Sequence, residues 1–231
     1  NLLWLPTLLH TNNKTEENNL LHILPKQKVL GKFERALSKK ALFFMQKNKQ
    51  TIGITGGIGS GKSVVAKILI SMGYPVYNSD DRAKDLINSN PELIAKIKSE
   101  FGNDIYTDLG LERKKMAAIV FNDPNKLAVL NSLVHPAVGK DFESWKNSQT
   151  TKFVFKEAAI LFETGIYKDL DAVILVTAPI SIRIDRVQKR DNASKEEIEN
   201  RMKNQWIDEE KIKLSDYVID NSGNQLIIPQ V

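Results

Sequence analysis

Hydrophobic positions follow two alternating patterns from residue 51 onward. Short, nearly continuous apolar runs predict strands buried on both faces, at 51–55, 74–78, 152–155, 172–178 and 217–221. Between these runs, apolar residues recur at spacings of three and four, which predicts amphipathic helices. Because strands that alternate with helices form right-handed crossovers, the pattern predicts an α/β fold with a three-layer arrangement around a parallel five-stranded sheet.

Helical patterns also fill the long interval between the second and third predicted strands. They are "RAKDLIN", "PELIAKIKSEFG", "LERKKMAAIVF" and "NKLAVLNSLV", within 82–150. Pro91 and Pro124 predict breaks between these helices. Pro136 predicts the end of the last one at His135, because the residue before a proline is disfavoured in helical geometry.

The first 50 residues differ from the remainder in pattern and in charge. Apolar residues between Lys32 and Asn48 recur at helical spacing, so an amphipathic helix could lie on a partner, on anionic lipid or on the protein's own core. This segment, 1–50, carries nine Lys and Arg against three Asp and Glu, whereas the remainder carries 24 against 25. The basic balance belongs to a segment of unassigned role, so a nucleic-acid partner is not favoured.

Composition narrows the class of protein further. Apolar residues make up 42% of the 231 residues, which is enough to bury a core. The chain has no run of about 18 apolar residues, so we expect no membrane-spanning helix. The absence of cysteine excludes disulfides and cysteine-ligated metal sites, and it fits a cytoplasmic location.

The segment "GGIGSGKS" at 56–63 matches the phosphate-binding pattern G-x-x-x-x-G-K-[ST], and it joins a predicted strand to a predicted helix. Glycines let backbone N–H groups converge on a phosphate, and the helix directs the positive end of its dipole at the same anion. We expect Lys62 to reach the β- and γ-phosphates of ATP and Ser63 to bind Mg²⁺. The predicted nucleotide-binding residues of this loop are Gly57, Ile58, Gly59, Ser60, Gly61, Lys62, Ser63 and Val64.

Asp80 follows the second predicted strand, at the edge where open parallel sheets bind ligands. Its carboxylate could accept a proton from a substrate hydroxyl or help to hold Mg²⁺. Ser79 and Asp80 are also good N-cap residues for the helix that follows, and the two roles are compatible.

Arg186 and Arg190 lie four residues apart on a predicted helix, with Arg183 three residues before Arg186. Clustered guanidinium groups suit a polyphosphate, although a solvated basic face would have the same spacing. The polar helical stretch that follows, 191–214, has few apolar positions. It is predicted to be a lid that closes over a nucleotide and excludes water.

Taken in order, these segments resemble the dephospho-CoA kinase family. The resemblance rests on "GITGGIGSGKS", "YNSDDRAK", "NSLVHP", "AAILFETGIY", "RVQKRDNASKEE" with "NRMKNQ", and "SDYVIDNSG". It extends from Thr51 to Gly223 and leaves residues 1–50 unmatched. The phosphate loop alone is generic, whereas the elements that contain His135 and Glu163 and the closing "VIDNSG" are much more specific to the family.

The resemblance implies a P-loop kinase that transfers the γ-phosphoryl group of ATP to the ribose 3′-hydroxyl of dephospho-CoA, the last step of coenzyme A biosynthesis. It implies that Asp80 orients or deprotonates the hydroxyl and that Arg186 stabilises the transferring charge. We also expect Arg190 to bind the nucleotide, next to Arg186. Asn221 would lie by the adenine, and His135 and Glu163 would line the acceptor site. The predicted catalytic residues are Lys62, Asp80 and Arg186, and the predicted metal ligands are Ser63 and Asp80.

The chain departs from the family pattern at several positions. Asn78 stands where many members have Asp, Val64 stands where Thr is usual, and Ala159 begins "AIL" where many members have "PLL". Members also continue into a final helix packed on the sheet, whereas "NQLIIPQV" is too short for one and contains Pro229. We therefore expect apolar sheet surface to be exposed.

The predicted organisation is an extension, a P-loop core in three pieces, an acceptor subdomain and a lid. The extension is 1–50 and the P-loop core is 51–81, 151–190 and 215–231. The acceptor subdomain is 82–150 and the lid is 191–214. Two alternatives stay open, namely another small-molecule P-loop kinase and a nucleotide-binding protein without catalysis. A GTPase is not favoured, because "NKLA" lacks the aspartate of a guanine-binding signal. No oligomeric state is predicted.

Overall fold

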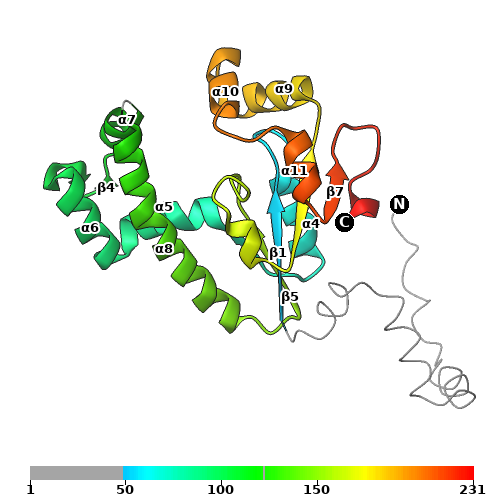
Figure 1. Ribbon diagram of the computed structural model, residues 1–231, viewed down its shortest axis with the longest axis horizontal. Helices are drawn as coiled ribbons and strands as arrows, with labels where there is room; N and C mark the ends of the chain where they lie inside the picture. Colours follow the sequence, from blue (N-terminus) through cyan, green and yellow to red (C-terminus); the bar gives the residue numbers. More distant parts are fainter. Residues whose placement is uncertain (1–48, 122) are drawn as a thin grey trace, which may run out of the picture. The chain divides into compact units, whose positions relative to one another are not determined.

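The computed structural model describes residues 49–121 and 123–231 (Figure 1). A five-stranded sheet lies at its centre in the order β2-β5-β1-β6-β7, and every neighbouring pair is parallel. The strands are β1 (Gln50–Thr55), β2 (Val76–Asn78), β5 (Phe153–Glu157), β6 (Ala172–Thr177) and β7 (Tyr217–Asp220). The predicted α/β fold with a five-stranded parallel sheet is confirmed. The helix expected between Lys32 and Asn48 lies outside the described residues.

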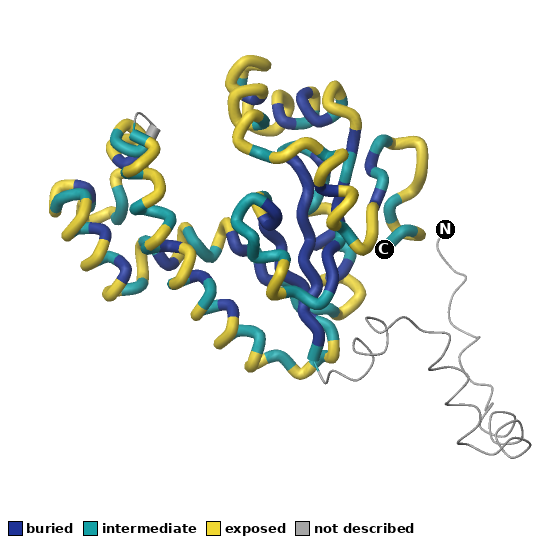
Figure 2. Tube along the Cα trace, in the orientation of Figure 1, coloured by how far each residue is buried: buried dark blue, intermediate teal, exposed yellow. Residues whose placement is uncertain are grey.

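The central strands end together at one edge of the sheet. Every residue of β1 is buried (Figure 2), as is typical of a central strand of a parallel sheet that is covered on both faces. Ile54 near its end pairs with Glu157 of β5 and with Ile174 of β6. The segments that follow β1 and β2 therefore leave the sheet at the same edge, and this edge carries the candidate chemistry.

Helices flank the sheet, and α4 contacts β1, β2 and β5 while α11 contacts β6. The α-helices are α4 (Lys62–Ser71), α5 (Ser79–Ser89), α6 (Pro91–Phe101), α7 (Arg113–Phe121), α8 (Pro124–Ser148), α9 (Ile180–Asp191), α10 (Lys195–Met202) and α11 (Asp208–Leu214). The short 3₁₀ helices are η1 (Asn103–Ile105), η2 (Ile166–Asp169) and η3 (Ile228–Gln230). None of the described helices is long and apolar enough to cross a membrane.

The predicted breaks at Pro91 and Pro124 are confirmed, because α6 and α8 begin at these residues. A proline at the first helical position loses no hydrogen bond, since the N–H there has no partner within the helix. The side chains of Asn90 and Asp123 cap the two helices by accepting backbone N–H groups of the first turn.

The predicted helix end at Pro136 is wrong, because α8 continues through it to Ser148. An internal proline costs a helix about 3 kcal/mol, since one N–H is missing and the ring crowds the preceding turn. Val134, Val138 and Phe142 are buried on one side of α8, and each buried side chain of this size contributes about 1.5–3 kcal/mol. Tertiary burial thus offsets the local preference.

Helices α5 to α8 form a group beside the sheet with a core of its own (Figure 1). Its buried side chains include Leu86, Leu93, Ile97, Ile105 and Met116. The group also holds a two-stranded antiparallel sheet of β3 (Tyr106–Thr107) and β4 (Gly110–Leu111). This small sheet was not predicted, because strands of two residues are too short to show an alternating pattern.

Three polar side chains join this helical group to the central sheet. The hydroxyl of Tyr77, on β2, donates to Asp141 Oδ2 of α8 at 2.7 Å. Arg82, on α5, donates to both carboxylate oxygens of Asp141, at 3.0 and 2.7 Å. Such charge-assisted hydrogen bonds fix the three elements relative to one another.

The segment after α9 packs more firmly than its polar sequence predicts. Ile198 of α10 is fully buried against Ile184 and Val187 of α9. Ser194 begins α10 with a capping box, because its hydroxyl accepts the N–H of Glu197 and the Glu197 carboxylate accepts the N–H of Ser194. The apolar side chains of Ile198 and Met202, together with the cap, therefore order this helix.

Apolar residues are exposed at strand β7 and just after it, as expected. Tyr217 and Val218 lie on this edge strand and are 60% and 45% exposed. Leu226 and Ile228 follow and are also exposed. The end of this segment returns to the strand, since the Gln230 side chain bonds the backbone N–H and carbonyl of Asp220.

Candidate functional site

The glycine-rich loop after β1 is shaped by close packing against α9 and the end of β7. Gly59 and Gly61 have positive φ angles of 78° and 101°, which favour glycine. A Cβ atom on Gly59 would lie 2.4 Å from the carbonyl oxygen of Arg183, and one on Gly61 would lie 2.1 Å from Asn221 Nδ2. These glycines are therefore required by space as well as by backbone geometry.

Lys62 is the first residue of α4 and lies inside the curl of this loop. Its Nζ donates to the carbonyl oxygen of Gly56 at 3.0 Å. Burial lowers the pKa of Lys62, and the carboxylates of Glu157 and Asp80 act in the opposite direction. The ammonium group thus lies within the electrostatic influence of both carboxylates, next to the helix N-terminus.

Glu157 is a residue of this site that the sequence interpretation did not identify. It ends β5, is 6% exposed, and accepts a hydrogen bond from the Ser63 hydroxyl at 3.0 Å. Asn78 of the neighbouring strand lies 3.5 Å from its other oxygen. Burial raises the pKa of Glu157, while the bond from Ser63 and the charge of Lys62 lower it.

Ser63, Glu157 and Asp80 supply oxygen donors that fit Mg²⁺. Because the Ser63 hydroxyl donates its hydrogen bond to Glu157, the lone pairs of its oxygen are free to face a cation. In the described ranges, no group of three or more His, Cys, Asp and Glu side chains is arranged to hold a metal alone. One hydroxyl with nearby carboxylates suits Mg²⁺, which keeps several of its waters.

Asn78 is the N-cap of α5, because its side-chain oxygen accepts the N–H of Asp81 at 3.0 Å. The alternative in which Ser79 or Asp80 caps this helix is therefore wrong, and both lie in its first turn. Asp80 is exposed and lines a cavity. Its carboxylate is not used to begin the helix.

The clustered arginines of α9 divide between two environments. Arg183 is buried, donates to the carbonyl of Ile58 at 2.9 Å and pairs with Asp208 at 3.3 Å. Arg186 donates to the Asn221 carbonyl at 2.9 Å and lies 3.5 Å from the carbonyl of Gly59. Both guanidinium groups therefore contact the phosphate loop.

Arg190, by contrast, is 63% exposed and is held by the neighbouring Asp191 at 2.6 Å. That contact raises the pKa of Arg190 and lowers that of Asp191. Asn221 is buried, and its Nδ2 donates to the carbonyl of Ser60 at 2.7 Å. In this structure Asn221 braces the phosphate loop, and Val64 is exposed at the start of α4.

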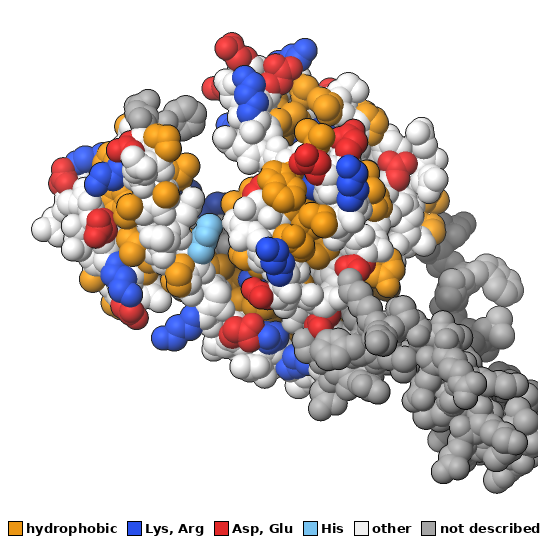
Figure 3. All heavy atoms as spheres, in the orientation of Figure 1, with side chains coloured by type: hydrophobic (Ala, Val, Ile, Leu, Met, Phe, Trp, Pro, Cys, Tyr) orange, Lys and Arg blue, Asp and Glu red, His pale blue; other side chains and the backbone are white. Residues whose placement is uncertain are grey.

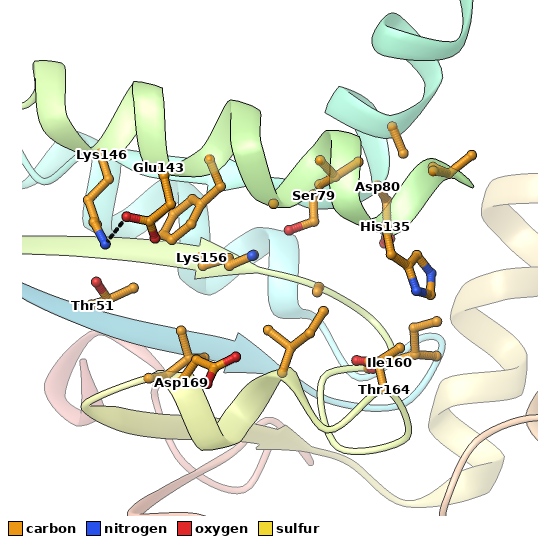
Figure 4. A pocket seen from close by; sticks show the side chains of 18 of the residues that line it. Thr51, Ser79, Asp80, His135, Glu143, Lys146, Lys156, Ile160, Thr164 and Asp169 are labelled. Atoms are coloured by element: carbon orange, nitrogen blue, oxygen red, sulfur yellow. Dashed lines mark hydrogen bonds and ion pairs between the residues drawn. The ribbon is translucent and has the colours of Figure 1, made fainter. Parts of the chain in front are cut away.

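A cavity of about 630 Å³ lies between α8, the sheet and the loop after β5. The surface is hollowed between the helical group and the sheet (Figure 3). Asp80 and His135 line one end of the cavity together with Ile160 and Thr164 (Figure 4). Partial burial lowers the pKa of His135 below its ordinary 6.5, so the imidazole is neutral at pH 7.

Glu163 is not among the residues that line this cavity. Its Oε1 accepts the N–H of Trp206 at 2.8 Å and pairs with the fully buried Lys211 at 3.0 Å. The rings of Phe162 and Trp206 stack at 6.4 Å between centroids. The loop after β5 is therefore tied to the segment between α10 and α11.

Gln205 forms a second connection that the sequence interpretation missed. Its Oε1 accepts the N–H of Ile58 at 2.9 Å, and its Nε2 donates to the carbonyl of Ala159 at 3.3 Å. One side chain from the predicted lid thus contacts both the phosphate loop and the loop after β5. Gln205 ends the segment "NRMKNQ", which contributes to the family resemblance, but the sequence interpretation assigned it no role.

The model of the dephospho-CoA kinase family matches residues 50–226. A curated dephospho-CoA kinase from Porphyromonas gingivalis is 41% identical over 182 residues, which are 78% of this chain and 90% of that protein.

Solved structures show the same likeness. TT1252 from Thermus thermophilus is 35% identical with a TM-score of 0.72, over 80% of this chain and 94% of that one. Dephospho-CoA kinase from Campylobacter jejuni is 29% identical with a TM-score of 0.55, over 75% of this chain and 89% of that one.

Proposed function

The chain belongs to the dephospho-CoA kinase family, and we propose that it transfers the γ-phosphoryl group of ATP to the ribose 3′-hydroxyl of dephospho-CoA, giving CoA and ADP. One observation carries the proposal. Lys62 in the phosphate loop lies within the electrostatic influence of Asp80, and Asp80 lines the large cavity that also contains His135. Asp80 would therefore serve both the nucleotide site and the acceptor site.

The phosphate loop and its lysine would hold the nucleotide. Backbone N–H groups at the start of α4 bind phosphate with the help of the helix dipole. Lys62 would exchange its bond with Gly56 for the β- and γ-phosphates. Arg186, already in contact with the loop, would offset charge on the transferring group, while Arg190 would first have to leave Asp191. Asn221 would lie beside the adenine.

Asp80 would orient the acceptor hydroxyl and accept its proton. The carboxylate is exposed, lines the cavity and leaves the capping of α5 to Asn78. His135 is neutral at pH 7, so it would donate or accept a single hydrogen bond to the acceptor without adding charge. Alignment of this kind contributes most of the catalysis in phosphoryl transfer.

Ser63 and Glu157, with Asp80 through water, would hold Mg²⁺. When bound, the ion would neutralise charge that develops on the β- and γ-phosphate oxygens. With asparagine at position 78, Glu157 would supply the second carboxylate of the site. The cysteine-free composition is consistent with a reaction in the cytoplasm.

Release of ADP tests the proposed function directly. The full chain would be assayed with ATP and Mg²⁺ in three parallel reactions, with dephospho-CoA, with AMP and without an acceptor. We expect turnover with dephospho-CoA alone. Turnover with AMP would indicate another small-molecule kinase, and ATP binding without acceptor-dependent turnover would indicate a non-catalytic protein.

Asp80→Asn tests the assigned role. We expect kcat to fall about 10²- to 10⁴-fold, as for loss of a general base, with little change in ATP affinity. Asp81→Asn is a matched control, because Asp81 is exposed and pairs with Lys84 instead. If the Asp80 variant kept kcat within about threefold of the wild type, Asp80 would not be the base.

A further inference from the structure

Strand β5 sends its last two side chains to opposite faces of the sheet. Successive residues of a strand alternate in direction, so Glu157 contacts Ser63 at the phosphate loop while Lys156 lines the acceptor cavity. Figure 4 shows Lys156 beneath α8, with its ammonium nitrogen directed toward Ser79 across the cavity. Lys156 was not identified from the sequence, because a lysine inside a buried strand gives no ligand motif.

Lys156 is a buried cation without a counter-ion. It is 5% exposed, and its Nζ lies 4.2 Å from the centroid of the Phe142 ring. Within the described part of the chain, no carboxylate forms an ion pair with Lys156 and no acceptor is hydrogen-bonded to its Nζ. Lys146 lines the same cavity but pairs with Glu143 at 2.5 Å. Glu143 and Asp169 act on Lys156 only at longer range.

An unpaired ammonium group in this position favours an anionic ligand. Burial of a charge without a partner costs free energy, and burial correspondingly lowers the pKa of Lys156. A phosphate in the cavity would supply the missing counter-ion. The side chain lies on the cavity side of β5, away from Ser63 and the phosphate loop, so the phosphate would belong to the acceptor and not to ATP.

We propose that Lys156 binds the diphosphate of the acceptor and so selects an acceptor that carries phosphate next to the reacting ribose. The proposal rests on the proposed function, because dephospho-CoA has a diphosphate on the 5′-carbon of the ribose whose 3′-hydroxyl is phosphorylated. Lys156 and Asp80 line one cavity, so they engage these two groups of a single ligand. Lys156 acts as a binding residue that determines specificity.

Lys156→Met removes the charge and keeps a chain of similar length against Phe142. Calorimetric titrations of the full chain, wild type and variant, with dephospho-CoA, adenosine and ATP test the proposed role of Lys156. We expect the Kd for dephospho-CoA to rise about 10- to 100-fold, as for loss of a charge-assisted hydrogen bond. The Kd values for adenosine, which has no phosphate, and for ATP should change by less than about threefold. Lys156→Arg should keep most of the affinity.

Lys168→Met is the matched control, because Lys168 also lies over an aromatic ring, that of Tyr167, but is exposed and does not line the cavity. It should leave all three Kd values unchanged. The proposal would be overturned if Lys156→Met raised the Kd values for adenosine and dephospho-CoA equally. It would also be overturned if Lys156→Arg, at unchanged thermal stability, bound dephospho-CoA as weakly as Lys156→Met. A wild type that does not bind dephospho-CoA would overturn it too. Binding needs no turnover, so a chain that binds through Lys156 without kinase activity contradicts the proposed function alone.

Discussion

Glu157 and Asn78 lie on adjacent strands and have different roles at the same edge of the sheet. They are direct partners in the pairing of β2 with β5. Asn78 uses its side-chain oxygen to begin α5, and Glu157 presents the carboxylate to Ser63. Two neighbouring strands thus contribute a capping side chain and a carboxylate to the same edge of the sheet. The sequence shows the asparagine at position 78, but that it lies beside Glu157 depends on strand register, which the sequence does not show.

Glu157→Gln is expected to weaken the use of Mg²⁺. The amide keeps a hydrogen-bond acceptor for Ser63 but loses the charge, so the Mg²⁺ concentration for half-maximal activity should rise about tenfold, with ATP binding in the absence of Mg²⁺ nearly unchanged. The rate of ADP release, measured over a series of Mg²⁺ concentrations, gives this half-maximal concentration. The exposed Glu100→Gln serves as a control. An unchanged Mg²⁺ dependence would remove Glu157 from the metal site.

At the level of elements, the Tyr77–Asp141–Arg82 cluster connects β2, α8 and α5. The hydrogen bond from Arg82 lowers the pKa of Asp141 below its ordinary 3.8, and desolvation opposes it. A carboxyl group with a depressed pKa in the folded state stabilises the protein above the pKa of the unfolded state. That contribution is lost as the pH falls through the lower, folded pKa.

Asp141→Asn should therefore lower the free energy of unfolding at pH 7 by about 1–3 kcal/mol, the usual range for a hydrogen bond to a charged group. As the pH falls below about 4 and through the lower, folded pKa, the wild type loses this contribution and the two proteins should converge. Urea unfolding at a series of pH values measures both effects. A constant difference from pH 7 down to pH 3 would contradict the assignment.

At the level of the whole molecule, the core and the predicted lid are joined by a buried ion pair. Lys211 of α11 is fully buried, and Glu163 also holds the backbone of Trp206. Removal of one partner from such a pair typically costs about 3–5 kcal/mol, because a charge is left buried. The sequence interpretation placed Glu163 at the acceptor site through the family resemblance. It did not predict this ion pair, because the two partners meet only through tertiary packing.

Glu163→Leu should destabilise the protein more than Lys211→Met. The first variant leaves an ammonium group with no exposure, whereas the second leaves a carboxylate that still accepts the N–H of Trp206. The double variant should recover part of the loss, which thermal unfolding of the three proteins would show. Strictly additive losses would mean that the two charges are not coupled.

The sequence predicted what is local and repeated in many proteins. The five strands, the phosphate loop and the breaks at Pro91 and Pro124 follow from periodicity, glycine spacing and capping. Lys156 and Gln205 could not be predicted, because their environments are built by segments far apart in the chain. Pro136 was misinterpreted since a local preference was outweighed by burial on one side of α8.

The continuity of α8 has a geometric consequence for the size of the acceptor. His135 and Lys146 line the same cavity and are 11 positions apart on one unbroken helix. A helix rises about 1.5 Å and turns about 100° per residue, so the two side chains are separated by about 16 Å along the axis. Insertion of one residue between them would rotate Lys146 away from the cavity. Insertion of seven residues would return Lys146 to the cavity side and increase its distance from His135 along the axis by about 10 Å. Relatives that accept longer or shorter molecules should therefore differ here by whole turns.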